Sequence, residues 1–153
     1  MKELTFIRHC ESLSNSLNDS EILNSPLSLK GINDAEKLCG KYDLIIVSPL
    51  RRCQETYKYS KLYAPHIITN ELFREHITTI TECLENEEFK IESVENLLKR
   101  IQIAKEYLNK LDEENICIIT HADFVFYFTH KIIDNEYYGI WLDNGNKHII
   151  TLM

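Results

Sequence analysis

Residues 43–47 read DLIIV, a continuous apolar run after one acidic residue. Residues 116–120 read ICIIT and have the same character, and residues 4–8 (LTFIR) form a third β-prone run near the start of the chain. A strand that is apolar at nearly every position is typical of a parallel sheet covered on both faces. The three runs therefore predict central strands of a buried sheet.

Helical patterns occupy the segments between these runs. Apolar residues recur along 94–111 at the spacing of one helix face, which predicts a long helix there. Further helices are expected over 28–38, 49–63 and 122–132, and further short strands over 66–69 and 147–152. Alternating strands and helices predict an α/β fold, a three-layer α/β/α sandwich with a mostly parallel central sheet.

Size and charge narrow the class of protein. The chain has 153 residues, of which 44% are hydrophobic and 27% are charged, and we expect one domain over residues 1–153. The formal net charge of -7 disfavours a nucleic acid or an anionic membrane as a partner held by bulk charge. No apolar run approaches the roughly 18 residues that span a bilayer. Oligomeric state is not evident from the sequence.

The five cysteines are widely spaced and form no CxxC pair. That spacing argues against a zinc site or a thioredoxin-like motif. The N-terminal residues do not form a signal peptide, because Glu3, Arg8 and His9 interrupt any apolar stretch. We therefore expect reduced thiols and a cytoplasmic location.

Polar side chains follow each of the three buried runs. The first ends at Arg8 and His9, the second is followed by Ser48, Arg51 and Arg52, and the third ends at Thr120 and His121. Ligands of such sheets bind outside the carboxyl ends of the strands, so these groups should meet at one edge.

Guanidinium and imidazole groups without carboxylates or thiolates make a poor metal site and a good oxyanion site. An imidazole can attack phosphorus, guanidinium groups neutralise the phosphoryl oxygens, and a carboxylic acid can protonate the leaving group. We expect neither a metal nor another cofactor.

Several short motifs resemble those of the histidine phosphatase superfamily, the phosphoglycerate-mutase-like proteins. RHCES at 8–12, with Asn15 following, resembles the RHGE(T/S)xxN start of that family. In the same order, PLSLKG at 26–31 resembles PLTxxG, SPLRRCQET at 48–56 resembles SxLxRAxQT, and LFRE at 72–75 resembles the LRE segment. ES at 92–93 weakly resembles GES, and THA at 120–122 resembles (S/T)HGG. The resemblance covers nearly the whole chain and implies a short, phosphatase-type member.

The resemblance implies a role for each matching residue. His9 would be the nucleophile that becomes phosphohistidine, and His121 the second imidazole, which donates to the phosphoryl group. Glu75 would protonate the leaving oxygen and then help water to attack. A related branch of the family takes its acid directly after the second histidine. Asp123 lies one residue beyond that position and is the alternative to Glu75, which we favour.

The resemblance also implies how the phosphoryl group is bound. Arg8 and Arg52 would hold its oxygens, with Arg52 rather than Arg51 at the motif position. Asn15 would hydrogen-bond the phosphoryl group or hold its loop. Arg100 belongs to the predicted long helix, and we expect it on the polar face of that helix.

Two residues depart from the family pattern, since Cys10 and Ala122 stand where glycine is usual. A side chain at either position could crowd the pocket, or be excluded if φ were positive.

Three functions are compatible with these motifs. The first is metal-independent hydrolysis of phosphomonoesters through phosphohistidine. The second, a phosphoglycerate-type mutase, is less favoured because the segment between Glu75 and His121 is too short for a large enclosing lid. The third is a non-catalytic module that binds a phosphorylated ligand in a degenerate pocket, with Cys10 as its main support. The partner would be a small phosphorylated substrate or a phosphoprotein, and the residues that select it should lie in 12–26 and 76–92.

Overall fold

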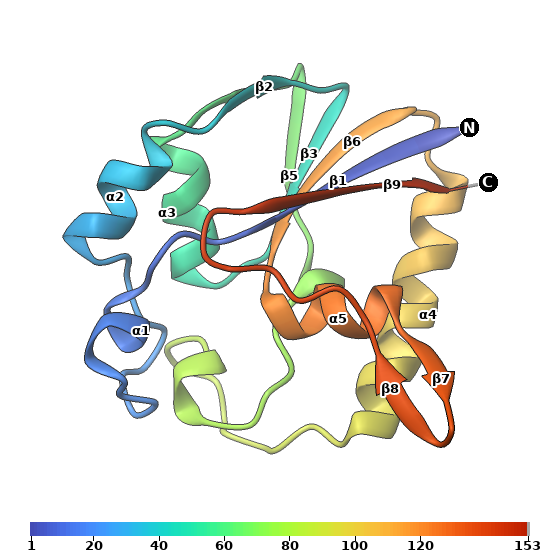
Figure 1. The fold of residues 1–153 in the computed structure, drawn as a ribbon. Helices are drawn as coiled ribbons and strands as arrows, with labels where there is room; N and C mark the ends of the chain where they lie inside the picture. Colours follow the sequence, from blue (N-terminus) through green and yellow to red (C-terminus); the bar gives the residue numbers. More distant parts are fainter. Residues whose placement is uncertain (153) are drawn as a thin grey trace.

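A five-stranded sheet forms the centre of the computed structural model, which describes residues 1–152 (Figure 1). Its strands are β1 (Lys2–Arg8), β3 (Leu44–Val47), β5 (His66–Thr69), β6 (Asn115–Thr120) and β9 (Lys147–Leu152). They are ordered β5-β3-β6-β1-β9, and only β9 runs antiparallel to its neighbour. The predicted mostly parallel sheet is confirmed.

Helices cover both faces of this sheet. The helices are α1 (Leu13–Leu17), α2 (Leu29–Ala35), α3 (Arg51–Tyr59), α4 (Val94–Lys110) and α5 (Ala122–Thr129), and two short 3₁₀ turns, η1 and η2, span Glu71–Phe73 and Ile80–Glu82. Figure 1 shows α2 and α3 on one side of the sheet and α4 and α5 on the other. The α/β/α sandwich is therefore confirmed.

Both faces of each central strand are buried, which explains the continuous apolar runs. On β3, Ile45 and Val47 pack in a cluster with Cys53 of α3, whereas Ile46 packs in the cluster that contains Leu97 of α4. Successive side chains of a strand point to opposite faces, so a strand between two helical layers has no solvated position.

Three of the expected helices are shorter than predicted, and the one expected over 28–38 ends at Ala35. The helix expected over 49–63 ends at Tyr59, and Lys61–Tyr63 instead forms β4, which pairs in parallel with β2 (Cys39–Lys41). The helix expected over 122–132 ends at Thr129, and β7 (Lys131–Ile133) and β8 (Glu136–Tyr138) form a hairpin.

The turn of this hairpin consists of Asp134 and Asn135, which have φ values of 52° and 65°. Aspartate and asparagine tolerate positive φ and are favoured in such two-residue turns. These two residues are therefore the signal in the sequence that indicates a hairpin rather than a longer helix.

The carboxyl ends of β1, β3 and β6 meet at one edge of the sheet. Arg8 pairs with Thr120 and Val47 with Ile119. The chain continues this register beyond the strands, because the amide of His9 donates to the carbonyl of Thr120 over 3.0 Å. The residues that follow the three strands are therefore neighbours in space.

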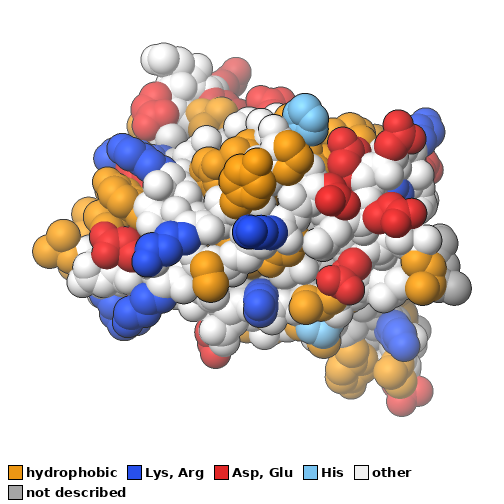
Figure 2. Space-filling model, turned by 90° about the horizontal axis from the view of Figure 1, so that it is seen from above, with side chains coloured by type: hydrophobic (Ala, Val, Ile, Leu, Met, Phe, Trp, Pro, Cys, Tyr) orange, Lys and Arg blue, Asp and Glu red, His pale blue; other side chains and the backbone are white. Residues whose placement is uncertain are grey.

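The outer surface carries charges of both signs. On the face seen in Figure 2, acidic and basic side chains are interspersed around scattered apolar ones. Among residues 1–152, no helix is both long enough and apolar enough to cross a membrane.

Candidate active site

His9 lies directly after β1 and is 2% exposed. Its Nδ1 lies 2.7 Å from the carbonyl oxygen of Cys10, which can only accept, so Nδ1 carries the ring proton and donates it. Burial, followed by the charges of Arg52 and Arg8, holds the pKa of His9 well below its usual value. The ring is therefore neutral, and the lone pair of Nε2 is free to act as a nucleophile.

His121 follows β6 and is completely buried. Its Nε2 lies 2.8 Å from Oγ of Ser48, and that oxygen also accepts from the amide of Leu50. This arrangement lets Ser48 donate its hydroxyl proton to Nε2 and favours a proton on Nδ1 of His121. Burial and the Arg52 charge also hold the pKa of His121 well below its usual value, so this ring is neutral as well.

Nδ1 of His121 lies close to Glu75, and the His121 ring lies close to the ring of His9. The two ring centroids are 5.3 Å apart, and Nδ1 lies 3.6 Å from a carboxylate oxygen of Glu75 without a hydrogen bond of its own. A buried N–H without a partner is unusual in proteins. It is available to an anion that enters between Glu75 and His9.

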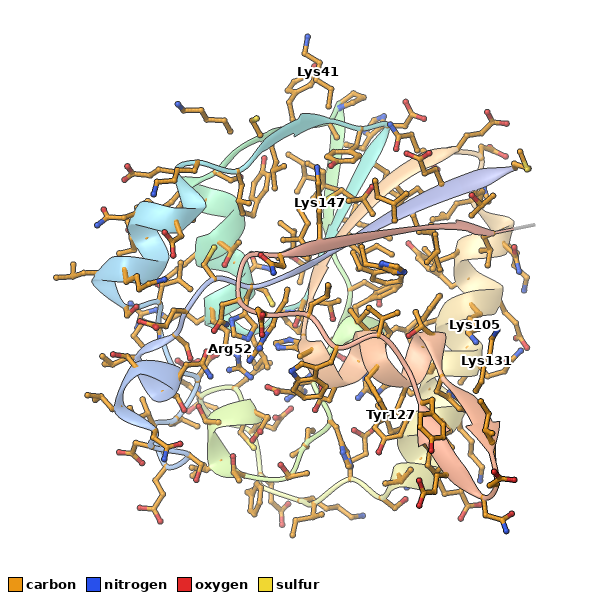
Figure 3. The ribbon with its side chains drawn as sticks, viewed as in Figure 1. Lys41, Arg52, Lys105, Tyr127, Lys131 and Lys147 are labelled. Carbon is orange, nitrogen blue, oxygen red and sulfur yellow. The ribbon has the colours of Figure 1, made fainter. Side chains whose placement is uncertain are left out.

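Arg52 is the second residue of α3 and is 3% exposed. Its Nη1 donates to the carbonyl of Thr81 over 3.0 Å, and its Nη2 donates to a carboxylate oxygen of Glu75. Figure 3 shows Arg52 at the end of α3 that lies at the carboxyl edge of the sheet. Arg51 is exposed and pairs with Glu55, so Arg52 is the arginine that reaches the site, as the motif position predicts.

Arg8 approaches the site from β1. Its Nη1 donates to the carbonyl of Leu142 over 3.0 Å, and its guanidinium carbon lies 5.9 Å from the ring centroid of Trp141. Burial lowers the pKa of Arg8, and the carboxylates of Glu75 and Asp123 partly offset that effect. Arginine stays protonated in proteins in spite of such a shift. Two fixed positive charges therefore flank His9.

Glu75 is held in place through its backbone by Arg100 of α4. The guanidinium of Arg100 donates to the carbonyls of Leu72, Arg74 and Glu75 over 2.8 to 3.2 Å. It also forms a bidentate pair with Glu92. Arg100 therefore faces the body of the protein, and the expectation that it lies on the polar face of the long helix is wrong. The reason is that its guanidinium is hydrogen-bonded to the carbonyls of the 72–75 segment.

Glu75 rather than Asp123 borders the open cavity. Glu75 is 22% exposed at its side chain, whereas one carboxyl oxygen of Asp123 is buried without a partner. Burial and the nearby Glu75 raise the pKa of Asp123 well above its usual value, which disfavours its charged form. Of these two carboxyl groups, Glu75 lines the cavity and Asp123 does not.

Asn15 closes the loop beside the site. Its Oδ1 accepts from the amide of Ser12 over 3.1 Å, and Oγ of Ser12 accepts from the amide of Asn15 in return. Asn144 also donates to Oδ1 of Asn15 and to the carbonyl of His9. Asn15 therefore holds the loop, and its Nδ2 remains as a donor on the cavity wall.

Gly31 lets α2 approach the chain that follows His9. A Cβ at this position would lie 2.0 Å from the carbonyl oxygen of Glu11, so no side chain fits there. Ser28 caps α2 by accepting from the amide of Gly31, and its hydroxyl donates to Oε1 of Glu11. This contact is the physical reason for the glycine of the PLSLKG segment.

Cys10 does not crowd the cavity. Its side chain is 1% exposed and packs with Leu27 and Ala35, away from the cavity lining. Burial raises the pKa of Cys10 to about 11, so the thiol is neutral. Neither Cys10 nor Ala122 is among the residues with positive φ in the part of the chain that the structure describes. Both departures from glycine therefore fit the backbone without strain.

A cavity of about 330 Å³ opens above these groups. Arg8, His9, Arg52 and Glu75 line one part of it, and polar side chains of 12–20 and 79–82 line the rest, the outer part of the cavity. His121 lies behind Glu75, outside this lining. The described residues contain no group of three or more histidine, cysteine, aspartate or glutamate side chains that could hold a metal ion.

Three contributing groups were given no role in the site from the sequence. Ser48 orients His121 and stands inside a quoted motif, so its position at a strand end was the available signal. The carbonyl of Thr81 and the guanidinium of Arg100 act across long sequence separations. The segment around Thr81 has no periodicity, and no signal in the sequence indicates either contact.

Comparisons with known proteins agree with the fold. No family model matches the sequence, and no curated protein matches it. Solved structures do match: a candidate alpha-ribazole-5'-P phosphatase from Escherichia coli K-12 is 19% identical, with a TM-score of 0.66 over 83% of this chain and 77% of that one.

Two further solved structures resemble the chain. A phosphoglycerate mutase from Thermus thermophilus is 20% identical, with a TM-score of 0.59 over 82% of this chain and 81% of that one. A mycobacterial hydrolase is 16% identical, with a TM-score of 0.55 over 83% and 78% of the two chains. The fold that the resemblance to the histidine phosphatase superfamily implies is thus confirmed.

Proposed function

We propose that this protein hydrolyses phosphomonoesters without a metal, through a phosphohistidine intermediate on His9. The observation that carries the proposal is the hydrogen bond from Nδ1 of His9 to the carbonyl of Cys10. That bond leaves the Nε2 lone pair of a neutral ring next to two guanidinium groups, which is the arrangement that in-line attack on a phosphoryl group requires.

In the first step, Nε2 of His9 forms a bond to phosphorus and the bond from phosphorus to the ester oxygen breaks. Once the phosphoryl group displaces it from Arg52, Glu75 acts as the general acid and passes a proton to the leaving oxygen. Arg8, Arg52 and the Nδ1–H of His121 stabilise the charge on the equatorial oxygens. The ring becomes a phosphorylated imidazolium, whose remaining N–H still donates to the carbonyl of Cys10.

In the second step, water attacks phosphorus and the bond between phosphorus and Nε2 breaks. The Glu75 carboxylate accepts a proton from the water, and inorganic phosphate leaves with His9 neutral again. The partial exposure of Glu75 supports hydrolysis, because water reaches this end of the cavity. A mutase would need the intermediate shielded from water, and the 76–120 segment offers only η2 and α4 for that purpose.

The binding-only alternative loses its main support, since Cys10 packs away from the cavity. The assignment of roles to His9, His121, Glu75, Arg8, Arg52 and Asn15 is part of this proposal. The cytoplasmic location predicted from the sequence stays a prediction.

The test is hydrolysis of p-nitrophenyl phosphate between pH 5 and 8 with EDTA present, for wild type and His9→Ala. Turnover that persists with the chelator and is lost in the variant supports the proposal. Quenching wild type during turnover should trap a protein that is heavier by one phosphoryl group, and the mass should shift on a peptide that contains His9. Turnover that persists in His9→Ala, or that EDTA abolishes, would overturn the proposal.

A further inference from the structure

The outer part of the cavity is lined by hydroxyl and amide side chains. Ser14, Asn18 and Ser20 line it on one side, and Thr79 and Thr81 on the other. No apolar side chain is part of the cavity lining in the described chain. A phosphomonoester whose alcohol part is aromatic or aliphatic would gain little from burial here. A substrate with a hydroxylated alcohol part would find hydrogen-bond donors and acceptors on both sides.

Thr81 offers a specific point of contact. The residue is 8% exposed, and its hydroxyl is buried without any hydrogen-bond partner. Its carbonyl accepts from Nη1 of Arg52, so the backbone of Thr81 lies next to the guanidinium that would hold the phosphoryl group. Buried hydroxyl groups are nearly always hydrogen-bonded, and Thr81 is one of the residues that line the cavity, so rotation of its side chain would bring this hydroxyl to a bound ligand.

Charge in the outer part argues against a second anionic group. Beyond Arg8 and Arg52, the lining contains no lysine or arginine in the described residues, and it does contain the carboxyl groups of Asp19 and Glu82. Burial and, second to it, the charge of Glu75 raise the pKa of Glu82, so a further negative charge beside Glu82 would add to the repulsion from Glu75. Once a phosphoryl dianion occupies both arginines, a further carboxylate or phosphate has no cation to pair with.

We infer that the preferred substrate is a small phosphomonoester with a neutral, hydroxylated alcohol part, such as a polyol or sugar phosphate. Phosphoglycerates and bisphosphates should be poor substrates, as should phosphopeptides, whose backbone and neighbouring side chains exceed the cavity. The inference rests on the proposed function for its kinetic consequences, although the preference should also hold for binding alone.

A matched pair of ligands isolates the charge. Glycerol 3-phosphate and 3-phosphoglycerate differ by a hydroxymethyl group in place of a carboxylate, and p-nitrophenyl phosphate serves as the reference substrate. We expect kcat/KM for glycerol phosphate to exceed that for phosphoglycerate by about tenfold or more, since carboxylates a few ångströms apart repel each other strongly near a protein surface.

Two variants test the residues behind this preference. Asp19→Asn should narrow the ratio between the two ligands, whereas Asp112→Asn, an exposed change in the loop before β6, should leave the ratio unaltered. Thr81→Val should lower kcat/KM for glycerol phosphate about fivefold relative to that for p-nitrophenyl phosphate, the effect of one hydrogen bond. Its melting temperature should not fall below that of wild type, because the deleted hydroxyl has no partner in the free protein.

Binding of both ligands to His9→Ala, measured by calorimetry, gives a result that does not depend on turnover. If wild type failed to hydrolyse p-nitrophenyl phosphate, the proposed function would be lost and the binding preference would still be measured. If p-nitrophenyl phosphate were hydrolysed but phosphoglycerate or a phosphoserine peptide were preferred over glycerol phosphate, the function would stand and this inference would be wrong. Equal binding of the two ligands to His9→Ala would overturn it as well.

Discussion

Replacing Glu75 by glutamine should tighten the binding of phosphate-like anions while it slows the hydrolysis of alkyl phosphates. In the ligand-free protein, a carboxylate oxygen of Glu75 accepts from Nη2 of Arg52 and lies 3.6 Å from Nδ1 of His121. The carboxylate therefore occupies the place between the two donors that the mechanism assigns to phosphoryl oxygens. A bound anion has to displace it.

The size of the effect follows from the hydrogen bond that is exchanged. A hydrogen bond between charged groups contributes about 1.5–3 kcal/mol, and a neutral amide in its place retains about 1 kcal/mol. The difference of about 0.5–2 kcal/mol no longer opposes the anion in the variant, so its Kd should fall by about 2- to 30-fold. Loss of a proton donor costs about 10²–10⁴ in rate when the leaving group needs the proton.

Calorimetric titration with orthovanadate and with inorganic phosphate, in EDTA, measures the first effect. The kcat values for glycerol phosphate and p-nitrophenyl phosphate measure the second, because nitrophenolate leaves without a proton and should suffer much less. Glu71→Gln is the matched control, since Glu71 is exposed in η1 and lies outside the cavity lining.

Two results would refute this reasoning. If vanadate bound the variant no more tightly than wild type, the carboxylate would not be competing for the anion site. If both substrates lost rate to the same degree, Glu75 would not be the proton donor, and Asp123 would be tested next.

Three further predictions concern stability, positioning and the unusual cysteine. The pKa of His9 is depressed in the folded protein, so the unfolded chain takes up a proton first as the pH falls below about 6.5, and stability should decline in that range. Chemical denaturation should show that His9→Gln reduces this decline by up to about 1.4 kcal/mol per pH unit, and an unchanged slope would contradict a neutral buried ring. Arg100→Gln should lower kcat about 10- to 100-fold, because it releases the segment that carries Glu75. The kcat of Arg100→Lys should lie between those of wild type and Arg100→Gln. In both variants, the Kd for vanadate should change far less than kcat. Equal effects on kcat and Kd would indicate a general loss of structure. Cys10→Gly should lose about 1–2 kcal/mol of stability without a gain in kcat, because the thiol fills a core position, whereas a rise in kcat would show that the thiol crowds the site.

Much of the fold could be predicted because both faces of the sheet are covered. The DLIIV and ICIIT runs have no solvated position, and both form central strands. The long helix was equally readable, since the buried residues of α4 recur on one face. The short strands β2 and β4 could not be predicted. Each has only three residues, and each is stabilised by its hydrogen bonds to the other strand, which leave no local pattern in the sequence.

The sequence by itself determined which chemical groups meet at the edge of the sheet. Arg8, His9, Ser48 and His121 each lie at the end of a buried strand or directly after it, so they reach the same edge as soon as these strands pair in parallel. The tertiary structure decided which way the other groups face. Arg52 is buried, and Cys10 packs away from the cavity, because each contacts residues far away in the chain. The hydrogen bonds from Arg100 to the segment that carries Glu75 also join distant parts of the chain. A side chain takes its direction from the partners that offer it hydrogen bonds or apolar contact, and only the folded chain brings those partners within reach.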